Sequence, residues 1–347
     1  MRPLVALAGA LLVLLAISGC SQPPTTPPPA PPSAPATLLE RVAEHAGNVT
    51  VDGKAAADWW AAWVQAHPER LPATPRNAEA RDAIVAELRA AGLYVEIHRY
   101  PVGTGPLRAP PQVPLTVSAV VAYHNGTGQP DHVIALTSHY DTMAGTLYGA
   151  YDNGSGTAAD LAVCKALAAR PMNKTLACIF FDGEEEGTLA SREFAKEVAG
   201  ASGQVHYDVV LGFDMTGINW PGYPAWKLYA WVGDEFAQPI FPFVNGTLHK
   251  VLGYPDAGAQ AFPFNDRNSD EASFKAIHVP TVRFAGGRTA STYPQYHMPQ
   301  DTVDFVDQFV GGRANFEAGL GAIIRTAVQL GLEFDQVSLA DLTAEYA

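Results

Sequence analysis

Acidic and histidine residues stand just beyond several short apolar segments of this 347-residue chain. Imidazole nitrogens and carboxylate oxygens suit zinc, and one carboxylate can bridge two cations. A single histidine would carry little weight, because most histidines of a folded chain are structural or lie on the surface. Five residues of these types together predict a site for two zinc ions: His139, Asp152, Glu185, Asp214 and His297.

The segments that precede these residues are short, apolar and rich in β-branched side chains, as buried strands are. They cover residues 133–138, 175–181, 209–213 and 279–284. Two further segments, residues 154–170 and 188–200, have a helical composition. The alternation predicts a three-layer α/β fold, with a mostly parallel or mixed central sheet and helices on both faces. Such sheets bind ligands beyond the C-terminal ends of their strands, where the candidate residues stand.

Six short motifs carry a more specific resemblance: HYD, GAYDNGSG, DGEEEGTLAS, FDMTG, SDEASF and YHMPQDT. In this order and spacing, over about residues 115–305, the chain resembles the co-catalytic zinc aminopeptidases of metallopeptidase family twenty-eight. The resemblance implies the zinc-exopeptidase fold, two zinc ions and peptide substrates.

The same resemblance assigns a role to each candidate ligand. It makes His139 and Asp214 particular to one zinc ion, and Glu185 and His297 particular to the other. Asp152 would bridge the two ions. Each zinc would then have three protein ligands and a shared position for water, as catalytic zinc sites do.

Three residues receive catalytic roles from the resemblance. Glu184 is expected to take a proton from the zinc-bridging water and to pass it to the leaving amine. Asp141 is expected to accept the second imidazole N–H of His139, with a strand-end cap as the alternative. Tyr296 is expected to hydrogen-bond the developing oxyanion, with a core or rim aromatic as the alternative.

Two neighbouring positions leave alternatives open. Glu186 follows the two functional glutamates and is expected to face solvent or to be structural. The family motif SDH reads SDE here, because Glu271 follows Ser269 and Asp270. This departure puts the role of the loop in doubt, although Asp270 could support substrate or metal without binding it directly.

Two other functions compete with the aminopeptidase. Glutaminyl-peptide cyclotransferases share the implied fold and resemble the chain at HYD and at Phe180–Glu185, but they use one zinc ion to cyclise N-terminal glutamine. Gly187 closely follows the glutamate pair in sequence, whereas cyclases carry a longer aromatic insertion there. This spacing and the form of YHMPQDT favour the peptidase. A silent metal- or peptide-binding lipoprotein is the third possibility. It is disfavoured because every expected ligand and the base are present.

The N-terminal residues predict export and lipid anchoring. Residues 1–20 have one arginine, an apolar run too short for a membrane span, and small residues before Cys20, which is typical of a bacterial lipoprotein signal peptide. Residues 21–36 read as a Pro-rich spacer. We expect a catalytic domain over residues 37–335 and a frayed tail over 336–347. The mature protein would be attached to the cell envelope, at an outer membrane or periplasmic face if the host is Gram-negative.

The net charge limits the partners. A formal charge of −13 argues against binding of nucleic acid and against direct attraction to anionic lipid, both of which favour basic patches. We therefore expect membrane attachment only through the lipid on Cys20. We also expect a monomer that acts on peptides.

The remaining cysteines and several tryptophans carry weaker signals. Cys164 and Cys178 are predicted to be buried apolar groups, while a disulfide between a helix and a strand stays open because the sequence does not give their separation. Trp220, Trp226 and Trp231 could line a substrate pocket, but core packing is the more common role of aromatic side chains.

Overall fold

The computed structural model describes most of the catalytic domain. The described residues are Leu38, Val42, 49–103, 115–201, 203–217, 228–233, 237–252, 259–264, 269–286 and 293–346. Residues 36–347 form one compact unit. The predicted signal peptide, spacer and Cys20 lie outside the described residues, as do Trp220 and Trp226. In the part that is described, no helix has both the length and the apolarity needed to cross a membrane.

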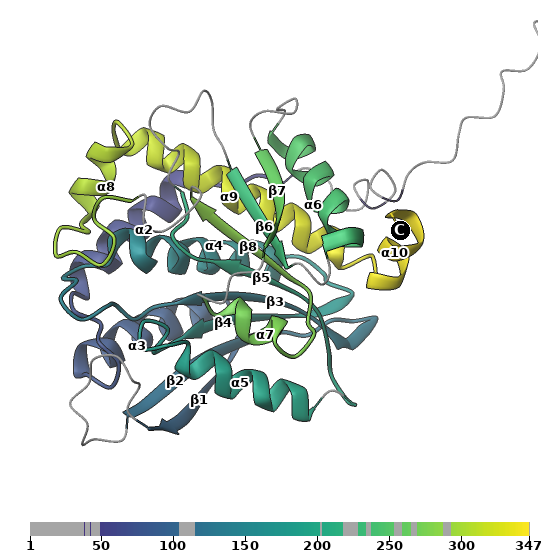
Figure 1. Cartoon of the computed structure of the whole chain (residues 1–347), viewed down its shortest axis with the longest axis horizontal. Coiled ribbons are helices and arrows are strands. Elements are labelled where there is room, and N and C mark those ends of the chain that lie inside the picture. The colour runs from purple at the N-terminus through teal and green to yellow at the C-terminus, as the bar shows by residue number, and fades with distance from the viewer. Residues whose placement is uncertain are drawn as a thin grey trace, which may run out of the picture. The chain divides into compact units, whose positions relative to one another are not determined.

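A mixed sheet forms the centre of the domain (Figure 1). Its strands are β1 (Tyr94–Val102), β2 (Leu115–His124), β3 (Gln129–His139), β4 (Lys174–Phe181), β5 (His206–Phe213), β6 (Leu228–Gly233), β7 (Ala259–Phe264) and β8 (Thr281–Gly286). The spatial order is β1-β2-β4-β3-β5-β8-β6-β7. The middle strands β4, β3, β5 and β8 are parallel, whereas β2 and β6 run antiparallel to them. The predicted α/β fold with a mixed sheet is confirmed.

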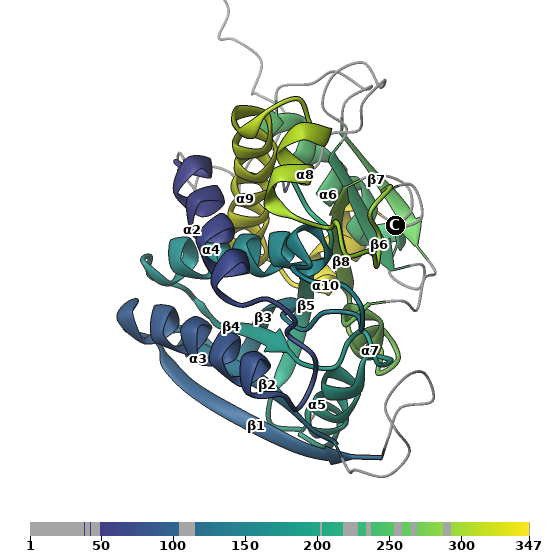
Figure 2. The same cartoon turned by 90° about the vertical axis from the view of Figure 1, so that its left-hand side faces the viewer.

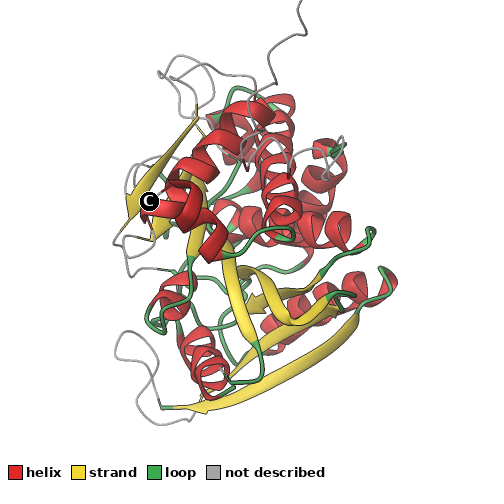
Figure 3. Cartoon of the chain, turned by 90° about the vertical axis from the view of Figure 1, so that its right-hand side faces the viewer, coloured by secondary structure: helices red, strands yellow, loops and turns green. Residues whose placement is uncertain are grey.

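Helices cover both faces of this sheet (Figures 2 and 3). They are α2 (Gly53–Ala66), α3 (Pro75–Ala90), α4 (Gly156–Ala168), α5 (Leu189–Gly200), α6 (Ala237–Leu252), α7 (Glu271–Lys275), α8 (Val303–Phe309), α9 (Arg313–Phe334) and α10 (Leu339–Tyr346). A short turn, η1 (Ala150–Ser155), in which Asp152 and Asn153 have non-helical backbone angles, leads directly into α4. The predicted helices over residues 154–170 and 188–200 correspond to α4 and α5.

The two helical layers pack on alternate side chains of the strands. All eight residues of β4 are buried, and from Leu176 to Phe181 its sequence is continuously apolar, as expected for a strand covered on both faces. Leu176, Cys178 and Phe180 point into the core shared with α2, α4 and α9. Ala177 and Ile179 point into the second core, which includes side chains of α5 and α7. Because successive strand residues face opposite sides, one apolar run supplies both cores.

Strand register brings the candidate residues to one edge of the sheet. His139 ends β3 and is paired in register with Phe181, the last residue of β4. On the other side of β3, Thr137 is paired with Gly212 of β5, so that His139 lies level with the position of Asp214. The segments after β3, β4 and β5 therefore begin side by side, at the edge where open α/β sheets bind ligands.

The structure decides two expectations about peripheral features. Cys164 of α4 and Cys178 of β4 are buried as predicted, and the disulfide that the sequence left open is formed between them. The packing of α4 on the sheet brings their Cα atoms to 5.9 Å, which is within disulfide range. The C-terminal tail is not frayed, because Leu339–Tyr346 forms α10 and buries Leu342 in the main core.

Candidate active site

The five predicted metal ligands converge beyond the C-terminal ends of β3, β4 and β5. The Nε2 atom of His139 lies 3.5 Å from Asp152 Oδ1 and 3.7 Å from Asp214 Oδ1. The Nε2 atom of His297 lies 3.2 Å from Asp152 Oδ2 and 3.0 Å from Glu185 Oε2. Two groups of three donors therefore lie side by side and share Asp152, and a third group, of His139, Glu184 and Glu185, overlaps both.

The donor atoms of each group fit a divalent metal ion. Within each group they lie within 4.8 Å of one another, and they come from side chains that are buried or nearly so. Glu185 Oε1 and Asp214 Oδ1 are also buried without a hydrogen-bond partner among the described residues. Imidazole and carboxylate donors in sets of three suit zinc sites that keep a position open. The two groups that share Asp152 could hold one metal ion each.

Burial and mutual contact shift the pKa values of these groups. Burial alone would raise the pKa of Asp152, but its interactions with His139 and His297 hold this pKa at about 2. Burial and the nearby Asp152 raise the pKa of Glu185 to about 7. Burial lowers the pKa of His297, yet the two carboxylates outweigh it and raise the pKa to about 10. The buried carboxylates therefore favour a protonated imidazole or a bound cation at this edge of the sheet.

The loop that carries Asp152 is fixed by hydrogen bonds from other elements. Trp60 of α2 donates from Nε1 to the carbonyl oxygen of Ala150 at 2.6 Å. Asn153, which follows Asp152 through a cis peptide bond, donates from Nδ2 to the carbonyl oxygen of Phe213 at 2.9 Å. Asn153 Oδ1 accepts from the backbone N–H of Met215 at 3.1 Å. Asn153 therefore ties the Asp152 loop to the segment that carries Asp214.

Asp141 lies near His139 and also accepts hydrogen bonds from the backbone of the glutamate pair. Its Oδ1 lies 3.4 Å from His139 Nδ1, which is long for the expected hydrogen bond, and that nitrogen has no partner among the described residues. However, Asp141 Oδ1 and Oδ2 accept the backbone N–H groups of Glu184 and Glu185, each at 3.2 Å. The fully buried carboxylate therefore holds the backbone of the glutamate pair.

Glu184 lies beside the converging donors. Its Oε2 is 3.8 Å from His139 Nε2, and its side chain is 10% exposed. Burial raises its pKa well above the usual value, while the nearby His139 opposes the rise. A carboxyl group in this environment can hold a proton at a pH where an exposed glutamate would lose it.

The sequence of this chain matches a known protein family. A sequence model described as Peptidase family M28 matches residues 119–315, which is more than half of the chain. The chain belongs to peptidase family M28. The match confirms the family predicted from the motifs, and it includes every residue predicted to bind metal.

Several proteins are similar to this chain in sequence, and two of them are named as aminopeptidases. Aminopeptidase YwaD of Bacillus subtilis is 26% identical over 178 residues, which are 51% of this chain and 37% of that protein. The probable lipoprotein aminopeptidase LpqL of Mycobacterium tuberculosis is 26% identical over 211 residues, which are 52% of this chain and 40% of that protein. The matches thus span less than half of the length of either relative.

Solved structures share the fold at lower identity. BSAP, a zinc aminopeptidase from Bacillus subtilis, superposes with a TM-score of 0.65 at 16% identity, over 82% of this chain and 96% of that chain. The glutaminyl cyclase of Fimbriiglobus ruber gives 0.62 at 16% identity, over 84% and 97%. The fold of this M28 chain is therefore common to peptidases and cyclases and does not separate them.

Tyr296 and Glu186 are both packed against the rest of the protein. Tyr296 stacks on the ring of His297 with a centroid distance of 3.7 Å and packs against the main core. Glu186 is only 8% exposed, so the solvent-facing alternative is wrong. Glu186 lies in a tight turn in which Gly183 and Gly187 have positive φ and the backbone N–H of Gly187 donates to the carbonyl oxygen of Glu184.

The departure from the SDH motif has a structural counterpart. Glu271 begins α7, and its carboxylate lies 3.3 Å from the guanidinium of Arg283 on β8. Both side chains are at least 90% buried, so each supplies a charge that the other needs. Asp270 is also buried, and burial raises its pKa to about 8. The SDE loop therefore has an ion pair at the position where the family motif has histidine.

Sequence reasoning missed two buried charged residues that shape the site. Arg70 is fully buried and donates to the carbonyl oxygens of Tyr140, Tyr148 and Gly149, at 2.6–3.1 Å. It therefore holds the connection between His139 and Asp152, but no motif surrounds it. Asp301 is fully buried next to the Asp152 loop and lies in the motif YHMPQDT, which could have indicated a role.

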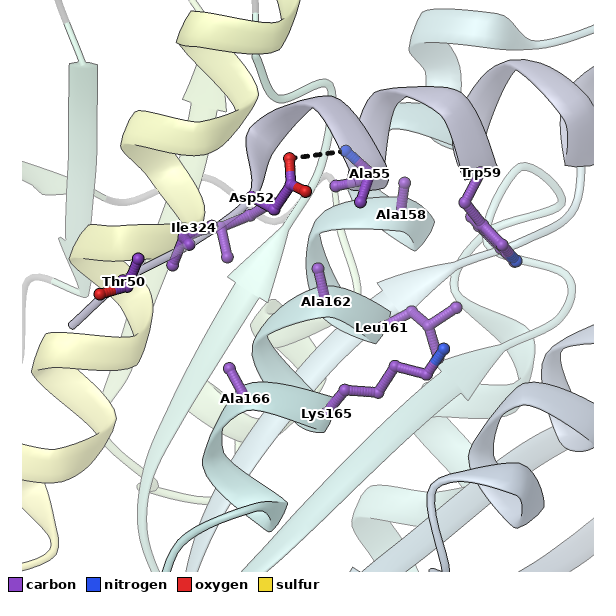
Figure 4. Close-up of a pocket in the computed structure, with 12 residues that line it drawn as sticks. Thr50, Asp52, Ala55, Trp59, Ala158, Leu161, Ala162, Lys165, Ala166 and Ile324 are labelled. Carbon is purple, nitrogen blue, oxygen red and sulfur yellow. Dashed lines mark hydrogen bonds between the residues drawn. The ribbon is translucent and has the colours of Figure 1, made fainter.

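A separate cavity of about 460 Å³ lies between α2, α4 and α9 (Figure 4). Its described lining is mostly apolar, including Trp59, Leu161 and Ile324. Lys165 lines it too, but its ammonium group is paired with Glu87. None of these lining residues belongs to the converging donors, so the cavity is distinct from the candidate active site.

The loop from His139 to Asp152 provides a matched test of local packing. Gly145 and Gly149 have φ of 92° and 51°, but only Gly149 is crowded, since an added Cβ would lie 2.5 Å from Asp152 O and 2.5 Å from Thr142 Cγ2. We expect Gly145→Ala to cost about 1 kcal/mol of stability from backbone strain and Gly149→Ala about 2–4 kcal/mol. Denaturant unfolding measures both. An equal or larger loss for Gly145→Ala would contradict the crowding argument.

Proposed function

We propose that this chain is a zinc-dependent aminopeptidase that removes N-terminal residues from peptides. In this proposal His139 and Asp214 bind one zinc ion, Glu185 and His297 bind the other, and Asp152 bridges them. The observation that supports it is the sharing of Asp152 between two three-donor groups with Glu184 beside them. The names of relatives such as aminopeptidase YwaD agree with it.

Zinc bound in this site would supply Lewis acidity, which polarises the scissile carbonyl group and eases deprotonation of water. Glu184 accepts the proton at a carboxylate oxygen while the water oxygen bonds to the carbonyl carbon. The same carboxyl group then gives the proton to the amide nitrogen as the C–N bond breaks, so that a carboxylic acid and an amine leave. In this proposal Asp141 positions Glu184 through its backbone, and Tyr296 contributes a phenolic O–H near the carbonyl oxygen.

A glutaminyl-peptide cyclotransferase is the second candidate, because the fold is shared with cyclases. The tight turn after β4 favours the peptidase. In this turn the backbone N–H groups of Gly187 and Thr188 both donate to the carbonyl oxygen of Glu184 at 2.8 Å. No longer insertion follows the glutamate pair, whereas an aromatic insertion there is what the cyclase resemblance calls for.

A substrate panel separates the two activities. We expect the full-length protein to release amino acids from aminoacyl amides and short peptides and to form no pyroglutamyl product from N-terminal glutamine. A chelator should abolish turnover, and added zinc should restore it. Zinc should be present at two ions per chain. Pyroglutamate formation without aminoacyl release would instead establish the cyclase, and undiminished turnover in metal-free protein would exclude both.

The neighbouring glutamates permit a sharper test. Glu184→Gln retains the size of the side chain but cannot accept a proton, so kcat should fall by about 100-fold or more while two zinc ions stay bound. Glu185→Gln removes an anionic ligand, so one zinc ion should be lost more readily and excess zinc should restore part of the activity. Zinc stoichiometry and kcat distinguish the variants. Loss of a zinc ion from Glu184→Gln would mean that the two roles are reversed.

We also propose that the protein is exported and attached to the cell envelope by a lipid on Cys20. The N-terminal sequence supports this, and so does the similarity to LpqL, a probable lipoprotein aminopeptidase. The disulfide between Cys164 and Cys178 agrees with export, because structural disulfides form in oxidising compartments.

Substitution of the anchor residue tests this location. Cys20→Ala should move the protein from the membrane fraction to the soluble fraction, because the lipid on Cys20 is the proposed attachment to the membrane. Specific activity should stay unchanged, since the spacer separates Cys20 from the catalytic domain. Fractionation and activity assays measure both. Retention of the variant in the membrane fraction would refute lipidation at Cys20.

A further inference from the structure

The carboxylate of Asp301 is directed at the backbone of the loop that carries Asp152. Its Oδ1 accepts the backbone N–H of Tyr151 at 3.0 Å, and its Oδ2 accepts the backbone N–H of Asp152 itself at 3.0 Å. The hydroxyl of Tyr293 donates to Oδ1 at 2.9 Å. Asp301 is 0% exposed, so protein groups rather than water satisfy it. Hydrogen bonds from amides to a buried carboxylate are among the stronger ones in proteins.

These bonds act at the residue that the two donor groups share. One Asp152 oxygen faces His139 and the other faces His297, so the direction of this one side chain matters to both groups. Asp301 binds the amide of Asp152 and the amide before it, which fixes the main chain from which the side chain projects. No other carboxylate among the described residues is recorded as accepting the Asp152 amide.

Asp301 also belongs to the segment that supplies His297. The two residues are four positions apart in the chain, and the backbone N–H of Asp301 donates to Met298 O at 3.1 Å within a compact turn. The carbonyl oxygen of Asp301 accepts from Ala150 N at 3.2 Å, so side chain and backbone both contact the Asp152 loop. A displacement of one segment would therefore move the other.

We propose that Asp301 is a positioning residue that orients the bridging carboxylate of Asp152. The inference rests on the proposed two-zinc site and adds a specific consequence to it. Removal of a ligand particular to one zinc weakens that zinc alone, whereas loss of Asp301 weakens both together. Residues that orient metal ligands typically change metal affinity by about 10- to 100-fold.

The test compares two buried aspartates. Asp301→Asn replaces one acceptor by a donor that faces an N–H or O–H group, and we expect both zinc ions to be lost at chelator concentrations at least about tenfold lower than in the wild type. Asp335→Asn is the matched control. Asp335 is likewise buried and accepts the backbone N–H groups of Asn173 and Lys174, but it lies at the opposite end of β4. Asp335→Asn should reduce the stability of the fold without changing the number of zinc ions retained.

Zinc-loaded full-length proteins are titrated with a chelator, the zinc retained per chain is counted, and circular dichroism checks the fold. Wild-type retention in Asp301→Asn, loss of only one zinc ion, or an equal loss in Asp335→Asn would overturn the positioning role. A wild-type protein that binds fewer than two zinc ions would instead overturn the two-zinc site.

A second measurement needs no variant. If Asp301→Asn does not fold, hydrogen exchange of the wild-type protein after zinc removal tests the same contacts. The amides of Tyr151 and Asp152 should remain as protected as those of β3, because Asp301 rather than zinc holds them. Rapid exchange of these two amides in an otherwise protected protein would refute the proposal.

Discussion

The concentration of buried carboxylates at one edge of the sheet is the constraint on which the site depends. Asp141, Asp152 and Glu185 are each at most 7% exposed, and Glu184 and Asp214 lie beside them. Burial of like charges is costly unless cations or hydrogen-bond donors balance them. Backbone amides, two imidazoles and, in the proposed function, two zinc ions meet this requirement. The surrounding loops are arranged to deliver those partners.

The sheet makes this concentration possible without long connections. Because β4, β3 and β5 are adjacent and parallel, three chain segments begin at the same edge with no need for extended loops. The disulfide between α4 and β4 links the element after Asp152 to the strand before Glu184. The buried Arg70 donates hydrogen bonds to carbonyl oxygens of the loop that follows β3 and so holds that loop in place. Rigid elements thus set the distances between donors.

The sequence predicted those parts of the fold whose signals are local. The buried strands β3, β4 and β5 each contain an apolar run, and each is followed by candidate site residues, so the strands and the candidate ligands could be found together. Strands β2, β6 and β7 were not predicted. Arg70 acts on carbonyl oxygens 70 or more residues away, and Cys164 meets Cys178 only because α4 packs on the sheet. Contacts of this kind depend on tertiary structure, which no local pattern records.

Main-chain placement explains how one fold can serve more than one reaction. Asp141 binds the amides of Glu184 and Glu185, and Asp301 binds the amide of Asp152. Carboxylates that are not themselves members of the donor groups thus fix the backbone of the residues that converge. The backbone frame is therefore separable from the identity of the side chains it presents. Substitutions such as Glu271 for the family histidine, balanced by Arg283, can then change the surroundings while the donors stay in place. A frame of this kind is expected where solved structures of the same fold include both peptidases and cyclases, since function resides in the residues presented rather than in the fold.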